Sequence, residues 1–77
     1  MSLCNLDHSL EDVRKKFESQ RNFLSSEVCE LFADFFREEH SQEILNDVFH
    51  LLKKYDLVSE EEREARTNRL LLILKNV

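Results

Sequence analysis

The chain has 77 residues, of which 42% are hydrophobic, and it carries a formal net charge of −5 with no glycine and no proline. A chain of this length has room for one domain, so we expect residues 1–77 to form a single helical domain, either a whole protein or a domain cut from a longer chain. Walker and dinucleotide-binding loops are excluded, because both need glycine. The acidic balance disfavours nucleic-acid binding, which depends on clustered lysine and arginine.

Apolar residues at alternating spacings of three and four run through residues 3–24, with Gln20 as a polar interruption. The spacing predicts a helix over residues 9–24. It could begin near Ser2 or near Ser9, and Ser9 is favoured because an acidic residue three positions on completes a capping box. Such a seam fits either a coiled coil with another chain or a bundle helix that faces its own core. Gln20 favours the bundle helix.

Two serines and a glutamate at residues 25–27 predict the start of a second helix, because serine before an acidic first turn is a helix-capping signal. We expect this helix over residues 26–39. One side of it is apolar and includes Phe36. The other side carries an acidic row, which is typical of a solvated face but would also suit a basic partner. The members of this acidic row are Glu27, Glu30, Asp34 and Glu38.

The stretch from Ser41 to Leu57 places two apolar rows side by side on a helix. The first row is Ile44, Val48, Leu51 and Tyr55, and the second is Leu45, Phe49 and Leu52. An apolar sector this wide is typical of a helix with neighbours on two sides. We therefore expect a central helix over residues 42–56, capped by Ser41. Lys53 and Lys54 would lie in its last turns, where the helix dipole favours cations.

Ser59, followed by three glutamates, predicts a fourth helix over residues 60–76. The first half of this helix is almost wholly charged, whereas Leu70 to Leu74 form an uninterrupted apolar run. A helix end that is apolar all round has to be covered on several sides. Three alternatives stay open for this end of the helix: it is wedged between the other helices, it meets another subunit or partner, or a longer natural chain covers it.

Few residues are suited to chemistry. Cys4 and Cys29 do not define a disulfide framework, and Cys4 with His8 has no second pair at structural-zinc spacing. We therefore expect no metal and no cofactor. A nucleophile pair between Cys29 and either His40 or His50 is allowed by spacing, but nothing nearby suggests an oxyanion hole. We expect Cys29 to be a small buried hydrophobe and the protein not to be an enzyme.

The elements together predict an all-α four-helix bundle around the helix at residues 42–56. Without a signal-peptide pattern or an apolar run near the roughly 20 residues of a membrane span, we expect an intracellular protein, cytoplasmic or nuclear, with no membrane insertion. The expected function is a non-catalytic protein–protein interaction or oligomerisation module of the adaptor or scaffold type. Its expected partners are proteins, and the alternative of a homodimer or higher oligomer stays open. Its expected contact residues are Phe36, Leu71, Leu72 and Leu74. The alternative is a small acidic regulatory subunit or inhibitor that docks on a basic protein surface through the acidic row.

Two stretches resemble known helical families in their apolar rhythm. Residues 49–63, FHLLKKYDLVSEEER, together with the leucine-rich end, resemble the later helices of death-fold interaction domains. Residues 23–32, FLSSEVCELF, are similar to harmonin-type N-terminal helical domains. Each resemblance implies a helical adaptor without catalysis. Both families have more helices than the four expected here.

Overall fold

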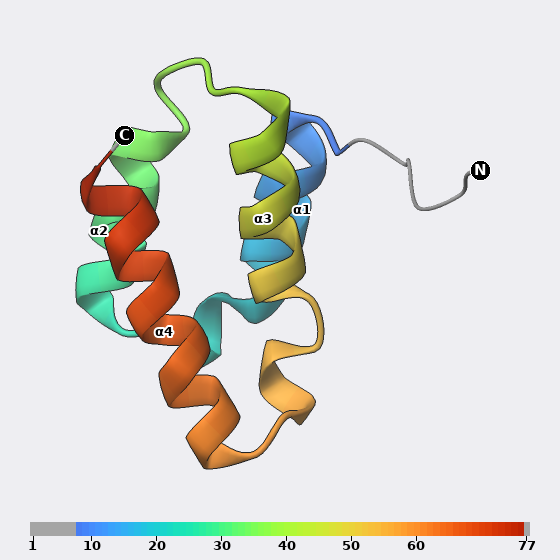
Figure 1. The fold of residues 1–77 in the computed structure, drawn as a ribbon, viewed down its shortest axis with the longest axis vertical. Coiled ribbons are helices and arrows are strands. Elements are labelled where there is room, and N and C mark those ends of the chain that lie inside the picture. Colours follow the sequence, from blue (N-terminus) through green and yellow to red (C-terminus); the bar gives the residue numbers. More distant parts are fainter. Residues whose placement is uncertain (1–7, 77) are drawn as a thin grey trace.

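Figure 1 shows the computed structural model, which describes residues 8–76. Within this range the chain forms four α-helices, two short 3₁₀ helices and no strand. The α-helices are α1 (Leu10–Gln20), α2 (Ser26–Phe35), α3 (Gln42–Leu52) and α4 (Glu60–Lys75). The 3₁₀ helices are η2 (Arg21–Phe23) and η3 (Tyr55–Leu57). The all-α four-helix bundle expected from the sequence is confirmed.

A serine side chain caps the start of every α-helix. Ser9 Oγ accepts a hydrogen bond from the Asp12 N–H, and the Asp12 carboxylate accepts one from the Ser9 N–H, which completes the predicted capping box. Ser25, Ser41 and Ser59 accept in the same way from the residue three positions on. Loss of such a cap typically costs about 1 kcal/mol. In a chain without proline, these serines define where each helix begins.

The helices α1 and α3 run parallel and side by side (Figure 1). His8, just before α1, donates its N–H to Asn46 in the first half of α3. At the other end, Gln20 bonds to Asp56, just beyond the end of α3. The helix α3 packs against both α1 and α4, and α4 packs against α2 and α3. The two-sided packing expected of the central helix is therefore confirmed.

The core draws buried side chains from all four helices, and aromatic rings join α1 to α2. The Phe17 and Phe32 ring centroids lie 4.6 Å apart, and those of Phe32 and Phe35 lie 5.7 Å apart. Phe17 belongs to the apolar seam of α1, which therefore faces the core of its own chain. The other buried members of the core are Val13, Val28, Leu45, Val48, Leu52, Leu70 and Leu74.

The helices α1 and α2 end earlier than the sequence pattern predicted, at residues 20 and 35 in place of 24 and 39. At the end of α1, the Gln20 side chain turns inward and makes two hydrogen bonds with Asp56, each 3.0 Å long. At the end of α2, His40 folds back so that its Nε2 lies 2.7 Å from the Phe35 carbonyl oxygen. The two glutamates that follow α2 would also lie unfavourably at the negative end of the helix dipole.

The helix α3 ends at Leu52 and not at residue 56, and α4 ends at Lys75, one residue before the expected end. Lys53 and Lys54 therefore form a turn outside α3. Lys53 is extended, whereas Lys54 adopts the left-handed conformation, with φ 56° and ψ 26°. It is the one residue with positive φ in the described part of the chain. Helices commonly end on a left-handed glycine, and this chain has none.

Replacing Lys54 with glycine is expected to raise the free energy of unfolding by about 1 kcal/mol, because glycine adopts the left-handed conformation without the Cβ clash. Lys53→Gly is the matched control, since it removes the same charge from a residue with negative φ. It is expected to lower the free energy of unfolding by about 0.5–1 kcal/mol. Urea unfolding of both variants measures the difference. Equal effects would contradict the assigned turn.

Candidate interaction surfaces

The leucine-rich end of α4 is largely covered by its own chain. Leu70 and Leu74 are 0% and 5% exposed and belong to the core, and Leu71 and Ile73 are half-buried. Only Leu72, at 60% exposed, points clearly into solvent. The burial of Leu74 corrects its expected place on a contact surface.

The cover comes from the packing of α2 against α4. Leu31 and Asp34 of α2 share a hollow with Leu74, and Lys75 Nζ lies 3.4 Å from Glu27 Oε2. Of the three alternatives for the leucine-rich end of α4, the first therefore describes most of it: the end is wedged between the other helices.

Phe36 lies just after α2 and is half-buried. Its ring centroid lies 5.5 Å from that of Phe17 and 5.5 Å from that of Phe32. The Arg14 guanidinium carbon lies 4.6 Å from the centroid of the same ring. Phe36 is therefore part of the aromatic contact between α1 and α2, with one face covered by a cation.

The acidic row expected along the second helix is exposed, but cations lie among its carboxylates. Arg37 Nη1 is 3.9 Å from Asp34 Oδ1, and Lys75 Nζ is 3.4 Å from Glu27 Oε2. The other two members of the row make no ion pair within the described residues. These pairs reduce the net negative charge that the row presents to a basic partner.

A second surface, which no sequence pattern indicated, lies at the end of the bundle that carries η2 and η3. We call residues 21–24 and 55–58 the η2–η3 end, at the lower end of the α1–α3 pair in Figure 1. Phe23 is 51% exposed and Leu57 is 74% exposed. With Leu72 they are the large hydrophobic side chains that the described part of the chain exposes. The two hydrogen bonds between Gln20 and Asp56 hold η2 and η3 at the same end.

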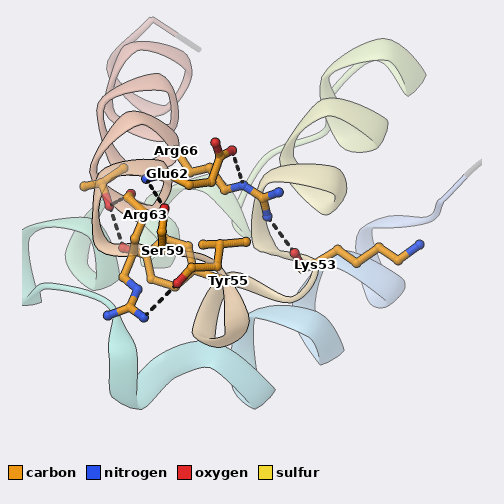
Figure 2. A network of polar contacts seen from close by, with 8 residues as sticks. Lys53, Tyr55, Ser59, Glu62, Arg63 and Arg66 are labelled. Atoms are coloured by element: carbon orange, nitrogen blue, oxygen red, sulfur yellow. Dashed lines mark hydrogen bonds and ion pairs between the residues drawn. The ribbon is translucent and has the colours of Figure 1, made fainter.

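A network of polar contacts holds the segment around η3 against α4 (Figure 2). Arg66 Nη1 donates to the Lys53 carbonyl oxygen at 2.7 Å, just before η3. Arg63 Nη2 lies 3.3 Å from the Val58 carbonyl oxygen, just after it. Both flanks of the turn that carries Leu57 are therefore anchored to α4. A side chain held on an anchored turn is pre-organised for contact.

Tyr55 anchors η3 from inside the molecule. It is buried, and its hydroxyl forms a hydrogen bond with the hydroxyl of Thr67 on α4. Thr67 Oγ1 donates to the Arg63 carbonyl oxygen at 2.9 Å, so Tyr55 is the donor in its bond to Thr67. The phenol ring thereby fixes η3 against α4, while Leu57 on the same short helix stays exposed.

The first turns of α4 carry an acidic cluster, which we define as Glu60, Glu61 and Glu64. These residues line an open hollow of about 310 Å³. Glu62 is different, because its carboxylate lies 3.0 Å from Arg66 Nε. The acidic cluster makes no ion pair within the described residues. It follows Leu57 closely in the chain, so an exposed apolar side chain and unpaired carboxylates lie at the same end.

An open hollow of about 400 Å³ lies beside the contact between α1 and α3, and we call it the α1–α3 groove. The His8 ring stacks on the Phe49 ring, with centroids 3.6 Å apart and planes 9° apart. Lys16 Nζ lies 5.5 Å from the Phe49 centroid. Neither Lys15 nor Lys16 makes an ion pair in the part of the chain described here. The residues that line the groove are His8, Asp12, Lys15, Lys16, Ser19 and Phe49.

The histidine and cysteine side chains that are suited to chemistry make contacts with a backbone carbonyl oxygen, with another ring and with the core. His40 contacts the Phe35 carbonyl oxygen, and His50 meets His8 edge-on, with centroids 5.7 Å apart. Cys29 is a free, half-buried thiol that packs against the core. In residues 8–76 no group of three or more His, Cys, Asp or Glu side chains could hold a metal ion. Cys4, which the sequence paired with His8 as a candidate ligand, lies outside these residues.

No helix within the described residues has the length and apolar character needed to cross a membrane. No family model matches the chain, and no curated protein or solved structure matches it. The function is therefore inferred from the surfaces described above.

Proposed function

We propose that the chain is a non-catalytic helical interaction module that binds protein partners through the η2–η3 end. One observation carries this proposal: Phe23 and Leu57 are exposed on turns that hydrogen bonds hold in place, while most other large apolar side chains are covered. Burial of such side chains against a partner contributes about 25 cal/mol for each Å² of apolar surface. A contact surface with no catalytic site described beside it supports an adaptor or scaffold role.

Two contacts support a role without catalysis. The imidazole Nε2 of His40 is in hydrogen-bond contact with a backbone carbonyl oxygen, and the thiol of Cys29 packs against the core. Neither side chain is placed to activate a bound substrate. The free thiol also supports a reducing location, in the cytoplasm or the nucleus.

The test compares Leu57→Ser with Leu72→Ser in pull-downs from extracts of cells that produce the protein. Both variants make the same substitution at an exposed leucine, so each should change the free energy of unfolding by no more than about 0.5 kcal/mol. We expect the proteins captured by the unmodified chain to be retained by Leu72→Ser and lost by Leu57→Ser. The reverse pattern would place the contact on the last turns of α4 and would contradict the proposal.

A second candidate is a small acidic regulatory subunit or inhibitor that docks on a basic protein surface. The observation that favours it is the acidic cluster, which makes no ion pair with a cation among the described residues. This candidate predicts binding that weakens steeply as salt is added, because screening acts on exposed charges. Binding that depends on Leu57 alone should change little with salt.

A further inference from the structure

We propose that the partner of the η2–η3 end is a second copy of this chain, bound head to tail through the α1–α3 groove. This inference rests on the proposed function and names its partner. It joins two surfaces that are described separately above. One is the acidic cluster with Leu57, and the other is the groove that holds Lys15, Lys16 and Phe49.

The charges of the two surfaces are complementary. The acidic cluster presents three carboxylates and the groove presents the ammonium groups of Lys15 and Lys16, and none of these groups makes an ion pair within residues 8–76. In one molecule these groups lie apart, on α4 and on α1 (Figure 1). Contact between two molecules brings them together, and complementary patches of this kind also steer encounter and fix orientation.

The apolar groups are complementary as well. Leu57 projects from its anchored turn with 74% of its surface exposed. The groove offers the half-buried ring of Phe49, which His8 covers on one face by stacking at 3.6 Å. A leucine that enters the groove beside this ring gains apolar contact, while the glutamates near it in the chain reach Lys15 and Lys16. The groove thus supplies both kinds of contact that the η2–η3 end needs.

The same charges argue against a contact that brings two like surfaces together. A two-fold contact between two copies of the acidic cluster, or between two copies of the groove, would bring like charges together, which is costly. A head-to-tail contact avoids this, and it leaves one free groove and one free acidic cluster on each assembled pair. Such heterologous contacts either close into rings or continue as open chains. We therefore expect assemblies larger than dimers as concentration rises.

The association should be weak and reversible. A standard interface buries about 800 Å² on each partner, a large share of the 5302 Å² that this small domain exposes. The net charge of −5 also makes molecules repel one another at long range. At about 0.1 M salt the Debye length is about 10 Å, so the long-range repulsion is screened more than the close pairs.

Sedimentation velocity over a concentration series tests the contact with charge-reversed variants. One variant carries Glu60→Lys and Glu61→Lys, and the other carries Lys15→Glu and Lys16→Glu. The unmodified chain should sediment faster as concentration rises, and each variant alone should remain monomeric. An equimolar mixture of the two variants should associate again, because each reversed surface then meets an opposite one. Recovery in the mixture also shows that both variants are folded.

The outcomes separate this inference from the proposed function. An unmodified chain that stays monomeric at every concentration would overturn self-association, and the Leu57→Ser pull-down would still decide the proposed function on its own. Association of the unmodified chain that both charge reversals leave intact would also overturn the head-to-tail contact. If Leu57→Ser associates like the unmodified chain and also retains every captured protein, the inference and the proposed function both fail.

Discussion

Replacing Leu70 with alanine is expected to lower the free energy of unfolding by about 2–5 kcal/mol, since Leu70 is fully buried and its loss leaves a cavity. Leu72→Ala, two residues along the same helix, should change it by less than about 0.5 kcal/mol, because the Leu72 side chain is mostly exposed. Urea unfolding followed by circular dichroism measures both. Native domains are stable by only about 5–15 kcal/mol, so the first variant should be clearly weakened. Equal losses would contradict the burial pattern of α4.

Replacing Phe32 with alanine is expected to cost about 3–5 kcal/mol. Phe32 is fully buried, and its ring contacts those of Phe17 on α1 and Phe35 on α2, so it joins α1 to α2. Phe23→Ala is the matched control, because Phe23 is half exposed on η2. The measurement is again urea unfolding, with the near-ultraviolet circular dichroism of the aromatic rings as a second probe.

Phe32→Ala could leave so small a domain unfolded, and Phe32→Leu then gives a measurable step. Leucine keeps most of the apolar volume, so its cost should be about 1–2 kcal/mol. We expect the free energy of unfolding to fall in the order unmodified chain, Phe32→Leu, Phe32→Ala. A Phe23→Ala loss as large as that of Phe32→Ala would contradict the aromatic core described here.

The starts of the helices could be predicted because their signals are local. Ser9 and Asp12 make a capping box within four consecutive residues, and Ser59 precedes its own acidic turn. The ends could not be predicted in the same way, since groups outside each helix determine them. The first helix ends where Gln20 bonds to Asp56, 36 positions away in the chain. No pattern within the helix itself carries that information.

The burial of the leucine-rich end of α4 also lay beyond the sequence. Its apolar character was evident, but whether the chain could cover it depended on how α2 and α3 pack around it. Both helices contact α4, so Leu70 and Leu74 are enclosed while Leu72 is not. The side chain of an individual residue can therefore be exposed even where its neighbours fill the core.

The η2–η3 end was missed for a related reason. Phe23 was expected inside the first helix and Leu57 beside the end of the third, and neither has a pattern that indicates exposure. Both residues lie in short 3₁₀ helices that follow α1 and α3. Gln20 and Tyr55, which hold these 3₁₀ helices in place, bond to residues far along the chain.

Amide NMR of isotopically labelled protein over a dilution series tests most directly where this molecule makes its contacts. We expect the concentration-dependent shifts to gather at Leu57 and the start of α4, and at Lys15, Lys16 and Phe49 in the α1–α3 groove. The last turns of α4, around Leu72, should not shift. Shifts confined to those last turns, or none at any concentration, would contradict a head-to-tail contact through the η2–η3 end.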